Sequence, residues 1–425
     1  MRRDLAELTR IIRRIEAKTR VTRATGNPLA SPSAAARPTI EALLDGAVEE
    51  TERGKLLVVR RRFPVDHRHG SQALIAAREA TPAALALLAR GDETATAGGR
   101  RLLYLDTETT GLAGGTGTYA FLVGVGFFDG DDFEIRQYFM RDLDEEPALL
   151  AALEEVFRRF DGFVTYNGAG FDLPLLETRF VLARRRFPGE AVHVDLLGPA
   201  RRLWSGRLAD CRLGTVERMV LRFTREDDLP GALIPTVYFE YLRRKRPDAL
   251  PRVFEHNRHD ILSLAALTGW VADAVARAPH PGLDPDALAG LGRMLEIAEP
   301  ERSLACYRMA LDRGLATPSR ERLLLRLALR EKRLARWDEA RALWEAAARS
   351  PLPPFDPRPW EEIAKVHEHR RRDLQAARLV VEEALVLARR HRASERVLTA
   401  FEHRLERLGR RLDRDTALGG ARQPA

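Results

Sequence analysis

The stretch from residue 100 to residue 140 constrains the fold of this chain most, because three β-rich runs follow one another there. RRLLYLD (100–106) is an apolar run that ends in an acid, and TYAFLVGVGFF (118–128) and FEIRQYFM (133–140) come after it. The last two runs are separated by Asp129-Gly130-Asp131-Asp132, which is a strong hairpin signal. The stretch therefore predicts antiparallel strands.

Strands and helices alternate after these runs. EPALLAALEEVFRRF (146–160) has helical periodicity with a proline in its first turn, GFVTYN (162–167) is a short strand, and FDLPLLETRFVLARRR (171–186) is a helix. AVHVDLL (191–197) predicts a further strand, and 251–276 a long helix. Because strand–helix–strand units give parallel neighbours, the pattern predicts an α/β domain with a mixed sheet, antiparallel first and parallel later.

The length of 425 residues suggests two or three domains. Residues 1–98 are interpreted as a partly disordered leader with one amphipathic helix near its start, a linker at 22–38 and an isolated strand at 56–62. Residues 99–279 form the predicted α/β domain. Residues 280–415 are predicted to be all-helical, and 416–425 to be a disordered tail.

The helical region contains a degenerate internal repeat. Ser303-x3-Tyr307-x2-Ala310 aligns with Ala340-x3-Trp344-x2-Ala347 at an offset of 37, and the next copy is placed at Ala376-x3-Val380, 36 residues further on. Small residues at helix crossings with such a period resemble tetratricopeptide (TPR) repeats. The resemblance predicts TPR-like helix pairs that bind a partner protein.

Composition excludes several classes of protein. Two cysteines, Cys211 and Cys306, provide neither a disulfide framework nor a CxxC metal site. The longest strongly apolar run, 119–128, is too short to span a bilayer, and the charged N-terminus lacks the apolar core of a signal peptide. We therefore expect a cytoplasmic protein with no membrane contact. A net charge of +8 permits a polyanionic partner without requiring one.

Asp106-Thr107-Glu108 lies at the carboxyl end of the first β-rich run. Residues two apart on a strand point to the same face, so Asp106 and Glu108 are expected to lie side by side. Paired acids at the end of a buried strand repel each other unless a cation neutralises them, and hard oxygen ligands suit Mg²⁺ or Mn²⁺. A strand-end acid that caps the following loop is the alternative interpretation of this motif alone.

Two further motifs carry acids. In Tyr166-Asn167-Gly168-x2-Phe171-Asp172 the aspartate comes at a helix start, where it could also be an ordinary helix cap. In EHNRHD (255–260), His256 and Asp260 are four residues apart and share a helical face, which an exposed His–Asp pair would do as well.

The order and spacing of these motifs resemble the DEDD superfamily of 3′→5′ exonucleases, which have a ribonuclease-H-like fold. LDTETTGLAGGTGTYAFLVG, YNGAGFDLPLLETRF, HVDLLGPARRLW and EHNRHDILSLAALT are, more specifically, similar to the YprB-type ribonuclease-H-like domain of bacterial proteins. The resemblance covers about 180 residues. Asp195, on the strand after the second motif, resembles a further acid of the family.

The resemblance implies phosphodiester hydrolysis with two ions of Mg²⁺ or Mn²⁺. Asp106, Glu108, Asp172 and Asp260 would hold the ions, and His256 would be the general base. In the superfamily the base is a Tyr four residues before the last Asp or a His five before it, so His256, at −4, combines the residue of one subfamily with the spacing of the other. His259 is assigned to packing or solvent. Residues next to the motifs would contact the substrate: Thr107, Thr109, Gly111, Leu112, Asn167 and Phe171.

The favoured hypothesis is therefore a metal-dependent nuclease, and more specifically a 3′→5′ exonuclease, that acts on DNA or RNA. The alternative is a non-catalytic nucleic-acid-binding or scaffold protein that uses the same core and the helical repeats.

Overall fold

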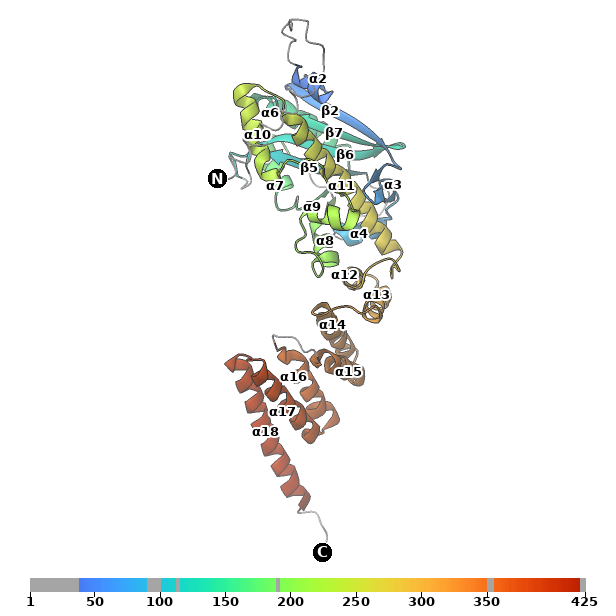
Figure 1. Ribbon diagram of the computed structural model, residues 1–425, viewed down its shortest axis with the longest axis vertical. Helices are drawn as coiled ribbons and strands as arrows, with labels where there is room; N and C mark the ends of the chain where they lie inside the picture. The colour runs from blue at the N-terminus through green and yellow to red at the C-terminus, as the bar shows by residue number, and fades with distance from the viewer. Residues whose placement is uncertain (1–37, 90–100, 112–114, 189–191, 350–354, 421–425) are drawn as a thin grey trace, which may run out of the picture. The chain divides into compact units, whose positions relative to one another are not determined.

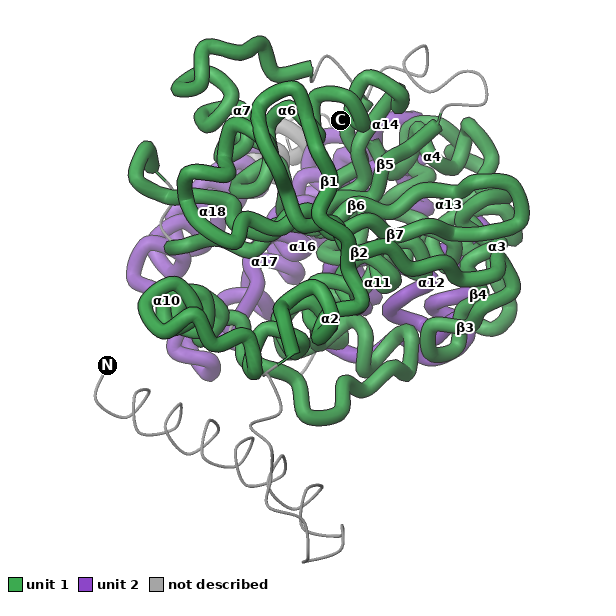
Figure 2. The backbone as a smooth tube through the Cα atoms, turned by 90° about the horizontal axis from the view of Figure 1, so that it is seen from above, with its two compact units in different colours: residues 1–282, 290–304 green, residues 283–289, 305–425 purple. Residues whose placement is uncertain are grey.

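The computed structural model describes residues 38–89, 101–111, 115–188, 192–349 and 355–420 (Figure 1). The chain forms two compact units, coloured separately in Figure 2. Unit 1 comprises residues 1–282 and 290–304, and unit 2 comprises 283–289 and 305–425. Within the described ranges, no helix combines the length and the apolar character needed to cross a membrane.

Unit 1 is built on a seven-stranded mixed sheet in the order β1-β2-β7-β6-β5-β8-β9. Neighbouring strands from β1 to β5 are antiparallel, whereas β5–β8 and β8–β9 are parallel pairs. This arrangement confirms the predicted fold class. The strands are β1 (Ala47–Thr51), β2 (Gly54–Pro64), β5 (Leu102–Thr109), β6 (Ala120–Asp129), β7 (Asp132–Phe139), β8 (Gly162–Thr165) and β9 (Val192–Asp195).

The predicted hairpin joins β6 to β7. Asp129 pairs with Asp132, so Gly130 and Asp131 form a two-residue turn, and Gly130 has a φ of 60°. Glycine adopts this left-handed conformation without the steric cost that a Cβ imposes. The turn fixes the register between β6 and β7.

The interpretation of residues 1–98 as a leader with an isolated strand is wrong for the segment that contains β1 and β2. Strand β2 pairs along its length with β7, for example Leu57 with Phe139, and β1 adds the edge strand. The sequence alone left LLVVRRR without a partner because that partner lies about 80 residues downstream, beyond the reach of local patterns. The predicted N-terminal helix and nearly all of the linker at 22–38 lie outside the described residues.

The rest of this segment is also folded. A small hairpin pairs β3 with β4, the short helices α3 and α4 follow it, and α2 precedes β1. These elements are α2 (Ile40–Leu44), β3 (Arg68–His69), β4 (Gln72–Ala73), α3 (Ile75–Arg78) and α4 (Pro82–Ala89).

Helices cover both faces of the sheet. Helices α6 (Glu146–Phe157) and α7 (Asp172–Leu182) bury their apolar sides with Leu103 and Leu105 of β5 in one core. The long helix α11 (Leu250–Ala276) crosses the other face, as Figure 1 shows, where it packs with α10 (Ile234–Arg244) in a second core. Because side chains alternate along β5, Leu103 and Leu105 face α6 and α7 while the even-numbered residues face α11.

Two glycines of β6 let α11 approach the sheet closely. A Cβ at Gly124 would lie 2.1 Å from the Asn257 side chain, and one at Gly126 would lie 2.5 Å from Ile261. Such distances are below van der Waals contact, so these two positions accept no side chain without movement. The glycines therefore set how near the residues of α11 come to β5.

The remaining helices of unit 1 lie between β9 and α10. They are α8 (Leu197–Trp204), α9 (Leu213–Val216), the π-helical η2 (Glu217–Leu221) and the short η3 (Gly231–Leu233), and η1 (Leu143–Glu145) precedes α6.

The C-terminal region is all-helical among its described residues, as predicted. Its helices are α12 (Pro285–Leu295), α13 (Pro300–Asp312), α14 (Ser319–Arg333), α15 (Trp337–Ala348), α16 (Pro357–Lys365), the π-helical η4 (Val366–Arg371), α17 (Leu374–Arg390) and α18 (Glu395–Gly420). The tail predicted at 416–425 begins too early, because α18 continues to Gly420, and 421–425 lie outside the described residues.

Burial corrects the register of the third repeat. The structure buries Ala377, Val381 and Ala384 rather than Ala376 and Val380, which are only partly buried. Buried positions thus recur at a constant interval of 37 residues, because 377 follows 340 by as much as 340 follows 303. The three sets of buried residues are Ser303, Tyr307 and Ala310; Ala340, Trp344 and Ala347; and Ala377, Val381 and Ala384.

The close approach of α11 makes a testable prediction at Gly124. We expect Gly124→Ala to destabilise the protein by about 2 kcal/mol, since the new methyl group must displace Asn257 from its present position. Urea unfolding measures the change. Gly117→Ala is the matched control, because nothing lies within 4 Å of a Cβ there, and equal stability of the two variants would contradict the packing described.

The corrected register predicts opposite responses at adjacent alanines. Ala377→Leu should overpack the helical unit and cost about 2 kcal/mol, whereas Ala376→Leu should cost well under half as much. Hydrogen exchange of α16–α18 in the full chain locates the effect. If Ala376→Leu lost more protection from hydrogen exchange than Ala377→Leu, Ala376 would be the buried position and the predicted interval of 36 residues would be correct.

Candidate metal and active site

Four acids predicted from the sequence come together at one end of the central strand. Asp106 and Glu108 lie on β5, Asp172 is the first residue of α7, and Asp260 lies on α11. One ligand atom from each of Glu108, His256 and Asp260 lies within 4.8 Å of the others. Asp106 is near enough to this group that the charges of Asp260, Glu108 and Asp172 all act on it.

The acids raise one another's pKa values. Burial is the main cause for Asp106 and Glu108, and the neighbouring carboxylates add to it. The pKa of Asp106 lies well above its usual value, and that of Glu108 rises to about 8, although His256 and Arg225 oppose that rise. Without a cation, the site therefore holds protons that ordinary carboxyl groups release below pH 5.

Glu108 also has an unsatisfied oxygen. Its Oε1 is buried and accepts no hydrogen bond. Asp106 accepts one side-chain hydrogen bond, 2.8 Å from Asn257 Nδ2, and Gln137 in turn donates to Asn257 Oδ1 at 2.9 Å. A buried carboxylate oxygen without a donor, within a set of hard oxygen ligands, fits Mg²⁺ or Mn²⁺.

A side chain of β5 holds Asp172 in place. Thr107, which points to the opposite face of β5 from its two acidic neighbours, donates to Asp172 Oδ1 at 2.5 Å. Burial raises the pKa of Asp172 to about 6, while the Thr107 hydroxyl and two backbone N–H groups limit the rise. Residue 107 thus orients the acid of α7, and its hydroxyl is already engaged before any substrate binds.

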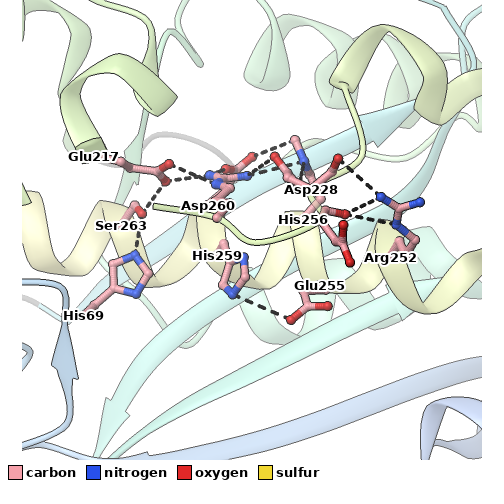
Figure 3. Close-up of polar contacts among 11 residues, drawn as sticks. His69, Glu217, Asp228, Arg252, Glu255, His256, His259, Asp260 and Ser263 are labelled. Carbon is pink, nitrogen blue, oxygen red and sulfur yellow. Dashed lines mark hydrogen bonds and ion pairs between the residues drawn. The ribbon is translucent and has the colours of Figure 1, made fainter. Parts of the chain in front are cut away.

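His256 faces the acids, as its position four residues before Asp260 predicted. Its Nε2 lies 3.7 Å from Asp260 Oδ2, and its Nδ1 lies 2.9 Å from Asp228 (Figure 3). Burial alone would lower its pKa, but the hydrogen bond with Asp228 and the charges of Asp260 and Glu108 raise the pKa to about 9. The ring is therefore protonated at neutral pH when no cation is bound.

Arg225 was not predicted, although it makes more polar contacts in the site than any acid does. It donates to both oxygens of Glu217, at 2.5 and 2.9 Å, and to Asp260 Oδ1, and it lies 3.3 Å from His256 Nδ1. The Glu217 side chain is 1% exposed and that of Arg225 is 10% exposed. The guanidinium is thus a buried counter-charge to the acid cluster.

Glu217 connects this pair to the N-terminal hairpin. Ser263 donates to Glu217 Oε1, and His69 Nε2 lies 2.7 Å from Ser263 Oγ (Figure 3). Burial lowers the pKa of His69 to about 3, so the ring is neutral and its Nε2–H donates to the serine. His69, which lies outside the sequence motifs, is therefore a buried anchor of the site.

Asp195 and His259, two further residues named in the sequence analysis, lie outside the acid cluster. The Asp195 carboxylate accepts backbone N–H groups of Asn167, Ala169 and Leu197 at 2.8–3.2 Å, so it shapes the loop that leads to α7. His259 packs edge-on against Phe223, with ring centroids 5.1 Å apart, and burial lowers its pKa to about 4.

The predicted substrate contacts lie on two loops beside the acids. Thr109 donates to the Gly111 carbonyl at 2.8 Å, and Leu112 lies outside the described residues. Asn167 is exposed with a φ of 66°, and Phe171 immediately precedes α7. These loops follow β5 and β8, whose carboxyl ends lie at the same edge of the sheet.

The raised pKa of Glu108 predicts a pH-dependent penalty in the metal-free protein. The folded state keeps a proton that the unfolded chain loses near pH 4.5, so stability falls as pH rises from about 4.5 to about 8. Glu108→Gln removes this slope and should make the protein more stable than wild type by roughly 1–3 kcal/mol at pH 8.5, with little difference near pH 5. Urea unfolding in EDTA at three pH values measures this.

Exposed Glu155 offers the control for that measurement. Glu155→Gln should leave the pH dependence of stability unchanged. A wild-type curve parallel to that of Glu108→Gln across the whole range would show that Glu108 does not carry the raised pKa.

Comparison with known proteins agrees with this geometry. The RNase_H superfamily model matches residues 103–272, which contain all four acids. The uncharacterized protein YprB of Bacillus subtilis (strain 168) is 32% identical over 333 residues, covering 76% of this chain and 78% of that protein.

The solved structures that match include the family B DNA polymerase of the hyperthermophilic archaeon Pyrobaculum calidifontis. It is 16% identical with a TM-score of 0.31, and the match covers 47% of this chain and 29% of that chain. The extent of the match to YprB, together with the superfamily domain on the mixed sheet, shows that this chain belongs to the YprB family of proteins with a ribonuclease-H-like domain.

Proposed function

We propose that this protein is a metal-dependent nuclease that hydrolyses phosphodiester bonds of DNA or RNA, with 3′→5′ exonuclease action. The observation that carries the proposal is the convergence of Asp106, Glu108, Asp172 and Asp260 in a partly buried cluster, in which the pKa values of Asp106, Glu108 and Asp172 are raised. A fold without chemistry gains nothing from such a cluster, because like charges near each other destabilise the folded state.

The four acids are the residues that would hold the cations. Mg²⁺ or Mn²⁺, when bound, supplies Lewis acidity and neutralises the charge that develops on the phosphoryl oxygens. Glu108, with its unsatisfied Oε1, and Asp106, with a single amide donor, have the most free coordination capacity. Asn257 fixes the orientation of Asp106, while Thr107 does the same for Asp172.

His256 is the proposed general base. The Asp228 carboxylate accepts from Nδ1, which leaves Nε2 directed at the acids (Figure 3). Because Asp260 and Glu108 raise the pKa of His256, neutralising these two carboxylates lowers it toward the ordinary value of a histidine. The imidazole can then accept the proton of the attacking water near pH 7.

The loops next to the acids are the proposed substrate contacts. Thr109 ends β5 and Gly111 follows it, while Asn167 and Phe171 lie between β8 and α7. The end of a nucleic-acid strand placed among these residues would lie beside the acids. The C-terminal helices are proposed to be TPR-like and to bind a partner protein, since their buried residues recur at 37-residue intervals.

Nuclease assays on the full-length protein test the proposal. Wild type with Mg²⁺ or Mn²⁺ should shorten 5′-labelled single-stranded DNA or RNA from the 3′ end and leave circular DNA intact. Asp106→Asn should lower kcat at least about 1,000-fold, and His256→Ala about 100- to 10,000-fold, the range for loss of a general base.

The matched controls are Asp144→Asn and Glu155→Gln, whose side chains are exposed and far from the site in sequence. Both should keep wild-type activity. If the wild type cuts neither nucleic acid with either metal, or if Asp106→Asn cuts as fast as wild type, the alternative of a non-catalytic binding protein is favoured.

A further inference from the structure

A cavity of 530 Å³ adjoins the acid cluster. Asp260 and His256 form part of its wall. Arg212 and Arg218, both exposed, and the buried Arg225 also line it, and they come from the segment between α8 and α10. None of the sequence motifs covers this segment.

Arg225 has one firm anchor and one exchangeable contact. Glu217 accepts two hydrogen bonds from it and is itself held by Ser263. Its Nη1 lies 3.3 Å from His256 Nδ1 and 3.6 Å from Asp228 Oδ2. The contact with Asp260 runs from Nη2 to Oδ1, and it is a single bond to an acid that the proposed function needs as a cation ligand. The anchored guanidinium can therefore give up Asp260 without leaving the site.

The contact with Asp260 opposes cation binding. A guanidinium and a divalent cation on one carboxylate repel each other, and Oδ1 is already used by Arg225. In the metal-free protein Arg225 thus neutralises part of the acid cluster. An anion that accepts from Arg225 instead would free Asp260 Oδ1 for the cation.

We propose that this cavity is a subsite for a backbone phosphate of the nucleic acid, and that a phosphate bound there takes the guanidinium of Arg225 from Asp260 and leaves Asp260 to the cation. The inference rests on the proposed function and deepens it. It assigns Arg225 as a positioning residue that makes cation binding depend on the substrate.

The chemistry of the cavity favours a phosphate. An arginine fork matches two phosphate oxygens, and such bonds are shorter and stronger than those between neutral groups. Arg212 and Arg218 add two exposed positive charges to the lining, and the hydroxyl-bearing residues Thr215 and Thr224 also line the cavity. The carboxylates of the lining, which belong to Glu217, Asp228 and Asp260, are each paired with Arg225. Binding of phosphate and cation must then be coupled with the same factor in both directions.

Calorimetric titration of the full-length protein with Mn²⁺ measures this coupling. The probe is adenosine 5′-monophosphate (AMP), which has no phosphodiester bond to cut, and adenosine is the matched control without the phosphate. A protein-free titration corrects for Mn²⁺ bound to AMP in solution. We expect AMP to raise the Mn²⁺ affinity roughly tenfold, within the usual range of coupling between sites, and adenosine to leave it unchanged.

Variants separate the roles of the arginines. Arg225→Gln should bind Mn²⁺ more tightly than wild type without AMP, and AMP should raise that affinity less than twofold. Arg218→Gln should bind AMP more weakly while its Mn²⁺ affinity without AMP stays at the wild-type value. Because loss of Arg225 leaves Glu217 buried and unpaired, the double variant Arg225→Gln/Glu217→Gln repeats the test with no buried charge left over.

Two results would overturn the inference. One is an equal effect of AMP and adenosine on Mn²⁺ affinity in the wild type, which needs no variant to observe. The other is AMP coupling that persists in the double variant. Failure of the proposed function is a separate outcome, since it shows as absent nuclease activity whether or not AMP and Mn²⁺ are coupled.

Discussion

The repulsion among carboxylates on and around β5 is the constraint on which the rest of the site depends. Asp106 and Glu108 lie on one face of a central strand, and Asp260 is brought to them from across that face. Each raises the pKa of its neighbours, so the folded protein either holds protons or requires positive charge. Nearly every other polar residue of the site can be understood as a response to that excess of negative charge.

The responses are of three kinds. Asn257 provides a neutral donor to Asp106, and Thr107 provides one to Asp172, which orients the acids without removing their charge. Arg225 provides a full positive charge, and His256 provides one that depends on pH. Glu108 Oε1 receives none of these, and it is the point at which the protein's own groups leave the site incomplete.

The scaffold makes this arrangement possible through backbone proximity. Asn257 reaches Asp106 because Gly124 has no side chain, and the same helix then places Asp260 one turn further along. Asn257 is three residues before Asp260, so both face the sheet. A single helix packed against two glycines thus sets the position of both the donor and the acid.

The sequence predicted the parts of the molecule that local patterns determine. Alternation placed Asp106 and Glu108 on one face, helical spacing placed His256 beside Asp260, and the turn at Gly130 was found from its residues. Asn257 could also have been predicted, because it lies within the same motif at helical spacing from Asp260. Arg225 and Asp228 could not, since they come from an irregular segment that carries no periodic signal and reach the site only through the tertiary fold.

The N-terminal segment shows the same limit, because local patterns identified a strand there but not its distant partner in the sheet. Strand β2 was recognised as a strand, but its partner β7 is distant in sequence, so its place in the sheet was missed. His69 lies in β3, which follows β2. In the structure this histidine supports Ser263, which supports Glu217, which holds Arg225 against Asp260. The N-terminal segment, interpreted from the sequence as separate from the α/β domain, therefore ends a hydrogen-bond chain that begins at Asp260. The charge balance of the site depends on residues on both sides of that predicted boundary.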